Sequence, residues 1–317
     1  MSAVERNDPL SSSFAGRADG LPLHTSSLQC IRHIDIARLA IRSLHAELVL
    51  YPKPGLVSPW DNGSHDDMDA ALFMRSLFSL RHYFTRIARA GAEAVPFAVL
   101  RHHGIEAERT MLAATRGINT HRGAIFALGL LCAAAGYCRL HGWPFSTTML
   151  RHALTTQWGV ALVAHSAAPM YGSHGQHAAM RFAVGGAREE AAAGFPSLFD
   201  VALPQLRRSL ASGRAVEEAQ IDTFFSLMAH IDDTNIYTRG GVEGAALMRS
   251  SAQQFLSRGG TAHPDWRAAA HDCHRQFVAR RLSPGGAADL FAATWFVHQL
   301  EQAEQAAQVS VMGGTDG

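Results

Sequence analysis

The chain has 317 residues, of which 47% are hydrophobic, and a formal net charge of +1. A chain of this length can bury a large core, as one domain or two, and its near-neutral charge gives no general reason to expect a nucleic acid or a membrane surface as partner. The four cysteines form no CxxC pair, which is typical of reduced thiols. We therefore expect a globular, cytoplasmic protein.

The two ends of the chain differ in character from the rest. The first segment, MSAVERNDPLSSSFAGRADGLPLHTSS, is interrupted by charges and prolines and lacks the apolar stretch of an export signal. We predict a flexible, disordered tail over residues 1–28, a short disordered tail over 309–317, and one domain over 29–308.

Helical periodicity dominates that domain, and runs of alternating β-branched and aromatic residues are scarce. The apolar run GAIFALGLLCAAAGYC is shorter than the roughly 20 residues that cross a bilayer, so it predicts a buried helix. The fold class is therefore all-α, as a single multi-helix globular domain. Helices are predicted at 31–50, 68–90, 105–115, 121–140, 216–230 and 241–256, and a last one has Ser283 as its N-cap and Pro284 at its first position.

Short joints rich in Gly, Pro and Asn separate these helices: YPKPGLVSPWDNGS, RGINTHRG, VGGAREEAAAGFP, DDTNIYTRGG and RLSPGG. Most of them place polar residues just before a helix, where free backbone N–H groups and the helix dipole favour an anion. The repetition predicts one anion-binding site assembled from several joints.

The first joint contains Lys53, the only lysine of the chain, between Pro52 and Pro54. The prolines stiffen the chain, so the lysine is presented on a rigid bend. A compact ammonium group can approach a single oxygen closely where a planar guanidinium would be too wide. We therefore predict that Lys53 holds a phosphate oxygen.

The same joint continues into SHDDMDAALF, where Asp66 and Asp69 stand three residues apart at a helix start. Carboxylates at this spacing share one helix face and are suitable oxygen ligands for Mg²⁺. An equally strong alternative is that these acidic residues simply complement the helix dipole.

In GIEAERTMLAATRGINTHRGAIF, Glu108 lies on a helix that leads into a crowded polar turn. Polar side chains have no packing reason to gather before the strongly apolar helix that follows, so the turn is a candidate binding and catalytic site. Its members are Asn119, Thr120, His121 and Arg122. The alternative, in which Thr120 is an N-cap and His121 is solvated, leaves the other two unexplained.

The later joints extend the site. Arg188 follows two glycines that let the backbone approach a ligand, and HIDDTNIYTRGG adds a second cluster that suits metal and phosphate: Asp232, Asp233, Asn235 and Arg239. Neither a GxxxxGK[ST] loop nor a GxGxxG fingerprint occurs, which excludes a P-loop or Rossmann site. Together these residues predict a polyphosphate held by basic groups and Mg²⁺.

Read in order, the joints resemble the triphosphoribosyl-dephospho-CoA synthase family, whose members serve citrate lyase and malonate decarboxylase. The matching pieces are KPGLVSPWDNGSHDDMD, GIEAERTMLAATRGINTHRGAIF, GAREEAAAGFP, DDTNIYTRGG and RLSPGGAADLFAAT. Two residues depart from the family pattern: Arg122 stands where lysine is usual, and Arg116 stands where glycine is common.

The resemblance implies a reaction in which ATP and 3'-dephospho-CoA give 2'-(5''-triphosphoribosyl)-3'-dephospho-CoA and adenine. A phosphoribosyl-dephospho-CoA transferase then attaches this precursor to an acyl carrier subunit. The triphosphate remains in the product, so cations must hold it while a carboxylate takes the hydroxyl proton. Phosphate contacts are expected from Lys53, Arg122, Arg188 and Arg239, and further nucleotide contacts from Asn119, Thr120 and Asn235. The expected Mg²⁺ ligands are Asp66, Asp69, Glu108 and Asp233. The expected catalytic residues are Glu108, His121, Asp232 and Asp233.

Two other functions remain open from the residues alone. An ADP-ribosyl hydrolase is favoured only by DDTN. A non-catalytic subunit that binds CoA or a nucleotide would gain little from clustered carboxylates unless they hold a metal. The pattern also leaves open which carboxylate is the base and whether malonate decarboxylase or citrate lyase is the client, and an Ala-rich helical surface could support a homodimer.

Overall fold

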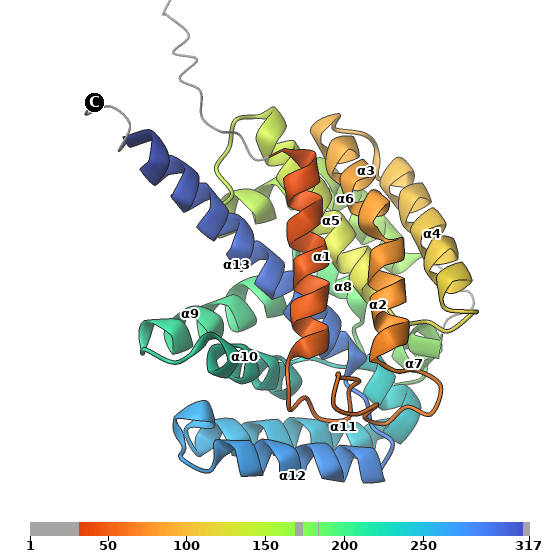
Figure 1. The fold of residues 1–317 in the computed structure, drawn as a ribbon. Helices are drawn as coiled ribbons and strands as arrows, with labels where there is room; N and C mark the ends of the chain where they lie inside the picture. The colour runs from red at the N-terminus through yellow and green to blue at the C-terminus, as the bar shows by residue number, and fades with distance from the viewer. Residues whose placement is uncertain (1–31, 169–173, 183, 313–317) are drawn as a thin grey trace, which may run out of the picture.

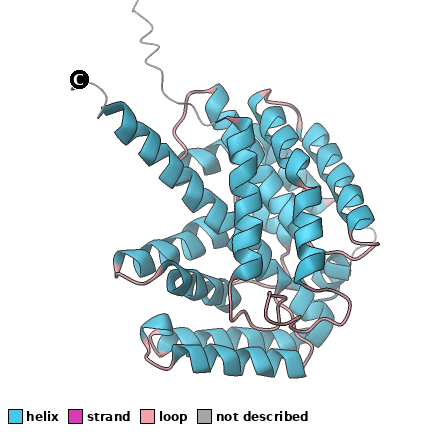
Figure 2. Ribbon diagram, in the orientation of Figure 1, coloured by secondary structure: helices cyan, strands magenta, loops and turns pink. Residues whose placement is uncertain are grey.

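The computed structural model describes residues 32–168, 174–182 and 184–312. These residues form helices and contain no strand, which confirms the all-α prediction (Figure 2). The helices are α1 His33–Val49, α2 Ala70–Ser79, α3 Arg81–Ala92, α4 Phe97–Ala114, α5 Arg122–Leu140, α6 Thr147–Ala167, α7 His174–Phe182, α8 Ala187–Ala192, the π-helix η1 Ser197–Ala202, α9 Leu203–Ala211, α10 Val216–His230, α11 Thr234–Ser257, the 3-10 helix η2 Gly260–Ala262, α12 Trp266–Ala279 and α13 Gly285–Met312.

The ends of the chain were predicted to be tails. Residues 1–28 lie outside the described residues. At the other end, α13 continues to Met312 and projects from the bundle (Figure 1), so residues 309–312 of the predicted second tail are helical. The remainder, 313–317, again lies outside the described residues.

Helix α5 is the centre of the single hydrophobic core. It packs against α1, α3, α4, α6, α8 and α13, and residues 127–138 are buried without interruption. Small residues allow this close packing, since a Cβ on Gly91 of α3 would lie only 2.0 Å from the carbonyl oxygen of Ala133. By length and composition α5 could cross a membrane, but 78% of its most apolar window is buried inside the protein. Its packing is that of a core helix, as predicted.

Several predicted helices differ in extent from the observed ones. The helix predicted at 68–90 is two helices, α2 and α3, which meet at the fully buried Leu80. No glycine or proline marks that break, so the sequence carried no signal for it. Helix α11 begins before the predicted start at 241, and Gly241, with φ 57° and ψ −153°, makes a kink at that point.

The long loop between α1 and α2 lies below these helices and beside α11 and α12 (Figure 1). Gly55 brings it against the segment before α13, because its φ is +68° and a Cβ there would lie 2.0 Å from the carbonyl oxygen of Leu282. Ser64 donates a hydrogen bond to the same oxygen. The loop therefore fixes the start of α13 relative to α1.

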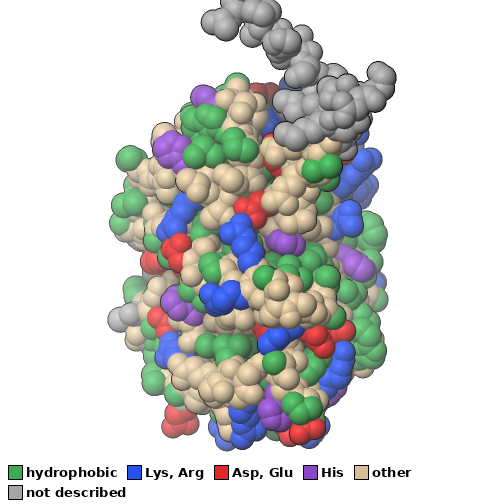
Figure 3. Space-filling model, turned by 90° about the vertical axis from the view of Figure 1, so that its left-hand side faces the viewer, with side chains coloured by type: hydrophobic (Ala, Val, Ile, Leu, Met, Phe, Trp, Pro, Cys, Tyr) green, Lys and Arg blue, Asp and Glu red, His purple; other side chains and the backbone are tan. Residues whose placement is uncertain are grey.

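Charge on the molecular surface is mixed. On the face seen in Figure 3, basic and acidic side chains are interspersed rather than gathered into a patch of one sign. This agrees with the net charge of +1. A charged ligand must therefore find its partners in a local cluster.

Candidate active site

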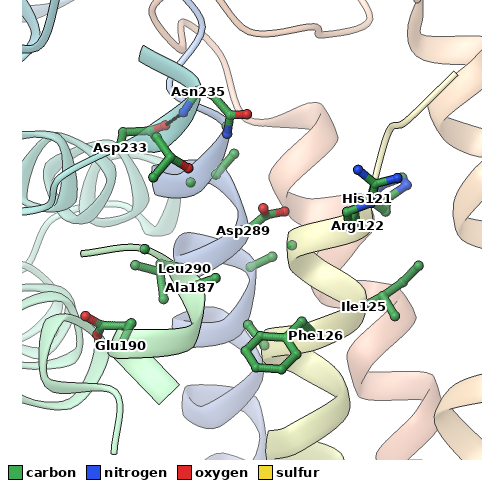
Figure 4. Close-up of a pocket in the computed structure, with 18 of the residues that line it drawn as sticks. His121, Arg122, Ile125, Phe126, Ala187, Glu190, Asp233, Asn235, Asp289 and Leu290 are labelled. Carbon is green, nitrogen blue, oxygen red and sulfur yellow. Dashed lines mark hydrogen bonds between the residues drawn. The ribbon is translucent and has the colours of Figure 1, made fainter. Parts of the chain in front are cut away.

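A cavity of about 1140 Å³ lies where the starts of α5, α8, α11 and α13 meet, with α4 along one side. Figure 4 shows His121 and Arg122 at the start of α5, Asp233 and Asn235 at the start of α11, and Asp289 on α13 between them. The polar joints singled out in the sequence therefore come together around one space.

Most of the predicted site residues line this cavity. They are Glu108, Asn119, Thr120, His121, Arg122, Arg188, Asp232, Asp233, Asn235 and Arg239. Among the described residues predicted for the site, Lys53, Asp66 and Asp69 do not line it. All three belong to the loop between α1 and α2.

Lys53 lies behind the cavity wall. Its side chain is 0% exposed, and its ammonium group contacts both the carboxylate and the backbone carbonyl of Glu47, which lines the cavity. Burial lowers the pKa of Lys53, and the Glu47 carboxylate opposes that shift. A direct contact between Lys53 and a phosphate is therefore incompatible with this geometry. The position suits lysine because a compact ammonium has fewer donors to satisfy in a closed space than a guanidinium.

Asp66 and Asp69 do not share a helix face, because α2 begins only at Ala70. Asp69 is the N-cap of that helix and accepts a hydrogen bond from the backbone N–H of Leu72 at 2.7 Å. Asp66 is 81% exposed and pairs with Arg281 at 3.1 Å. The capping interpretation accounts for Asp69, and the shared helix face on which the magnesium prediction was based is not present.

Asp233 joins the starts of two helices. One carboxylate oxygen accepts from the N–H groups of Asn235 and Ile236 in α11, and the other accepts from the N–H of Ala287 in α13 at 3.0 Å. The buried carboxylate replaces the predicted Ser283 as the cap of α13, which begins at Gly285. Burial raises the pKa of Asp233, and the backbone hydrogen bonds oppose that rise.

The neighbouring Asp232 is at the rim. It accepts a hydrogen bond from Tyr237 at 3.2 Å and forms an ion pair with Arg249 at 2.8 Å. Its side chain is 40% exposed. It is therefore accessible to a ligand but already has a counter-charge.

His121 is buried at the start of α5, with one ring nitrogen engaged and the other free. Thr120 donates a hydrogen bond to the Ser76 hydroxyl, which lies 2.6 Å from Nδ1 of His121. The opposite nitrogen, Nε2, is buried and has no hydrogen-bond partner. Burial and, to a smaller extent, the charge of Lys53 together lower the pKa of His121 to about 3. The imidazole is neutral, and because Ser76 can donate to Nδ1, Nε2 is set to carry the proton.

The other residues of that joint also have defined partners. The N-cap position of α5 is His121 and not Thr120, and the N–H of Arg122 donates to the Asn119 side chain at 3.1 Å. Arg122 forms an ion pair with Glu108 of α4. Both side chains are partly exposed to the cavity, at 39% and 31%. Arg122 therefore lines the cavity with its charge neutralised by Glu108.

His65, a histidine that was not singled out from the sequence, orients Arg239. The guanidinium can only donate, so Nδ1 of His65 accepts from it at 3.1 Å and Nε2 donates to Ser283 at 2.9 Å. Burial, and then the charge of Arg239, lower the pKa of His65 to about 4. Arg188, across the cavity, donates to the backbone carbonyl of His165 at 3.4 Å.

Asp289 is a cavity residue that sequence reasoning missed. It follows GGAA at the start of α13, in a segment otherwise apolar up to Thr294. Burial raises the pKa of Asp289 well above its ordinary range, and the charges of Glu47 and Asp233 raise it further. A single acidic residue in an apolar helix was the available signal, because such a residue is rarely buried without a purpose.

Arg116, which stands where glycine is common in the family pattern, lies in the turn between α4 and α5. Arg116 has φ 58°, in the left-handed region that glycine adopts without steric cost. The backbone therefore keeps the shape that a glycine would favour, and the Arg side chain is accommodated with some strain.

The metal prediction can be compared with the donors present. Among the described residues, no three His, Cys, Asp or Glu side chains converge as a metal site. Magnesium sites in nucleotide enzymes usually take one or two carboxylates and complete the shell with phosphates and water. The partly exposed Glu108 and Asp232 fit that requirement, whereas the oxygens of Asp233 are engaged by backbone N–H groups.

A cavity of this size, lined by basic side chains and helix starts, is suited to large phosphorylated ligands. The chain belongs to the ATP:dephospho-CoA triphosphoribosyl transferase family, whose model matches residues 33–308. It is a transferase, as the motif resemblance implied, and the match covers nearly all of the predicted domain.

Bacterial relatives agree. The chain is 40% identical over 283 residues to the "2-(5''-triphosphoribosyl)-3'-dephosphocoenzyme-A synthase" of Pectobacterium atrosepticum, covering 84% of this chain and 89% of the relative. It is also 40% identical over 263 residues to an Acinetobacter calcoaceticus protein named "Probable 2-(5''-triphosphoribosyl)-3'-dephosphocoenzyme-A synthase", covering 83% and 90% respectively. No solved structure matches the chain.

Proposed function

We propose that this cavity binds ATP and 3'-dephospho-CoA together and transfers the 5-triphosphoribosyl group of ATP to the ribose 2'-hydroxyl of dephospho-CoA, releasing adenine. The observation that carries this proposal is the convergence of the starts of α5, α11 and α13 on one space with Arg122, Arg188 and Arg239. Helix starts and guanidinium groups both favour phosphate oxygens.

The size of the cavity supports a two-substrate site. At about 1140 Å³ it exceeds the range of about 300–1,000 Å³ that is usual for a single small ligand. ATP with its triphosphate and dephospho-CoA with its pantetheine arm would together need such a volume. Apolar lining residues, among them Phe97, Phe126 and Leu130, would cover the less polar parts of the substrates.

The chemistry requires the bond between C1' of ATP and N9 of adenine to break while the acceptor hydroxyl attacks C1'. The three arginines would hold the triphosphate, which is kept in the product. Asn235 and His121 line the same space and would orient the sugars by hydrogen bonds. Holding both substrates in reacting geometry supplies much of the rate enhancement in such a transfer.

Magnesium is part of the proposal. It would neutralise the triphosphate, bound mainly by phosphate oxygens, with Glu108 or Asp232 as protein ligands. Both carboxylates are partly exposed and have arginine partners that a metal ion could replace. Neither would need to leave a buried position.

The product would be the precursor that a phosphoribosyl-dephospho-CoA transferase attaches to an acyl carrier subunit, of malonate decarboxylase or else of citrate lyase. The enzyme would act in the cytoplasm, where ATP and CoA precursors are available. A homodimer through an Ala-rich helical surface is compatible with this function and is not required by it.

The test is to incubate the purified protein with ATP, Mg²⁺ and 3'-dephospho-CoA and to measure adenine by chromatography and the CoA product by mass spectrometry. Adenine that forms only with dephospho-CoA, together with a triphosphoribosyl adduct, is expected. Adenine or ribosyl product formed without the acceptor would indicate a hydrolase instead. Binding without any adenine would indicate a non-catalytic subunit.

A further inference from the structure

The fold leaves two polar groups that line the cavity without a full set of side-chain partners. One is Nε2 of His121, which is buried and has no hydrogen-bond partner. The other is the carboxyl group of Asp289. Among the described residues no lysine or arginine forms an ion pair with it, and the attraction acting on it comes from the backbone N–H of Ala124 in the first turn of α5.

The remaining acidic residues of the cavity have partners that the fold supplies. Glu47 contacts Lys53, Glu108 pairs with Arg122, Asp232 pairs with Arg249, Asp233 accepts from three backbone N–H groups, Glu189 accepts from Gly186 N–H, and Glu190 accepts from the N–H and hydroxyl of Ser197. Within the part of the chain that the structure describes, Asp289 therefore has no ion pair and one backbone hydrogen bond, a condition that among these carboxyl groups it shares with Glu189.

The backbone makes room for this carboxyl group. A Cβ atom on Gly123 would lie 2.0 Å from Oδ2 of Asp289, so glycine lets the side chain reach the start of α5. Figure 4 shows Asp289 projecting from α13 into the space between α13 and α5, where His121 and Arg122 lie. The carboxyl group thus lies between the two helix starts that favour phosphate.

The surroundings of Asp289 favour its neutral form. Burial raises its pKa well above the ordinary range, and the negative charges of Glu47 and Asp233 raise it further, against a smaller effect of the Ala124 N–H. These surroundings favour the protonated carboxyl group, which is the form that can donate a proton. Adenine is a poor leaving group unless one of its ring nitrogens is protonated, so the reaction needs a donor of this kind.

We propose that Asp289 is the catalytic acid of this cavity, which protonates the departing adenine. The inference rests on the proposed function and adds to it the identity of the proton donor. Asp289 was not among the residues expected from the sequence, and its role does not depend on which carboxylates bind Mg²⁺.

The proposed step balances as follows. The bond between C1' and N9 breaks, its electron pair stays on the purine, and the Asp289 proton goes to a ring nitrogen, so adenine leaves neutral. The oxygen of the acceptor hydroxyl then bonds to C1'. Its proton passes, directly or through a water molecule, to the carboxylate at position 289, which restores the acid.

The experiment compares wild type and Asp289→Asn with two donors: ATP, and ATP methylated at N7, whose base can leave without protonation. Asparagine has nearly the shape of the protonated carboxyl group, so the variant is expected to fold and to bind ATP. With ATP its kcat is expected to fall about 10²- to 10⁴-fold, the usual contribution of general acid catalysis. With the methylated donor the deficit is expected to shrink to less than about tenfold, because no proton donor is needed.

The matched control is Asp200→Asn, which changes a carboxylate paired with Arg151 outside the cavity. It should match wild type with both donors. An unchanged rate in Asp289→Asn with ATP, or an equal deficit with both donors, would overturn the assignment. If wild type itself releases no adenine from ATP and dephospho-CoA, the proposed transfer fails, and that result is distinct from a failure at Asp289.

A second measurement needs no variant. If Asp289 must be protonated to act, kcat of the wild type with ATP should fall on the alkaline side of its pH profile, and that fall should disappear with the methylated donor. The same alkaline fall with both donors would contradict the proposal even if Asp289→Asn did not fold.

Discussion

The starts of α11 and α5 both face the cavity and both carry a buried polar side chain, yet the fold uses the two side chains differently. At α11, both oxygens of Asp233 accept hydrogen bonds from backbone N–H groups. At α5, the His121 ring is held through Nδ1 while Nε2 has no partner. Proximity to a cavity is therefore a weak guide to function. A group whose hydrogen-bonding atoms are all engaged by the fold stabilises the structure of the site, whereas a group with an unpaired atom can still form a hydrogen bond if a ligand reaches it.

The first test of this comparison removes the buried ion pair between Lys53 and Glu47. In Lys53→Met the carboxylate of Glu47 would stay buried without its counter-charge, so the free energy of unfolding should fall by about 3–5 kcal/mol. Urea unfolding followed by circular dichroism would measure it. Adding Glu47→Gln should recover most of the loss. If the double variant were as unstable as the single one, the ion pair would not be the cause.

The second test changes a hydrogen-bond acceptor at the start of α11. Asp233→Asn replaces an accepting oxygen by an amide that cannot accept from Ala287 N–H, so a loss of about 1–3 kcal/mol in unfolding free energy is expected. Thermal or urea unfolding would measure it, with Asp200→Asn as the exposed control. A loss below about 0.5 kcal/mol would mean that Asp233 is not the structural cap that its contacts indicate.

The third uses pH to distinguish the two regions. His121 is neutral in the folded protein, with a pKa of about 3 against 6.5 when unfolded. The unfolded chain therefore binds more protons, and stability should be full above pH 6.5 and decrease as pH falls, by at most about 1.4 kcal/mol per pH unit for this group. Unfolding measured at several pH values should show a shallower decrease in His121→Gln. An equal slope in both proteins would contradict the burial of a neutral imidazole.

The smallest effect is expected outside both regions. Asp66→Asn should change unfolding free energy by less than about 0.5 kcal/mol, because Asp66 is 81% exposed and its partner Arg281 is equally accessible to water. Adenine release should also match wild type at saturating Mg²⁺. A marked loss of magnesium affinity in this variant would show that the loop between α1 and α2 contributes to the site after all.

The sequence predicted the helical fold and the joints that surround the cavity, because helical periodicity and glycine-rich polar turns are local signals. It could not predict which atoms of each side chain would remain without a hydrogen-bond partner. Asp233 and Asn119 accept hydrogen bonds from backbone N–H groups that lie close by in sequence or at the start of another helix. Lys53 was predicted to present its ammonium group to a phosphate, but its burial against Glu47 depends on how the loop packs over α1.

Asp289 was missed for a related reason. It lies in an apolar helix whose sequence predicts a core helix. Its place in the cavity depends on the close approach to Gly123 at the start of α5, which is far away in sequence. Helix boundaries show the same limit, since Leu80 ends α2 through burial and not through any breaker residue. Local signals identify elements, and the pairing of distant elements decides which residues become reactive.

The burial of Lys53 has a practical consequence. Because it is the only lysine and its side chain is 0% exposed, an amine-reactive reagent meets no lysine on the folded surface. Labelling at this position requires the loop between α1 and α2 to separate from α1. The mass added at residue 53 over time would therefore record the opening of one defined part of the molecule, and slower labelling with substrates present would report how firmly they close it.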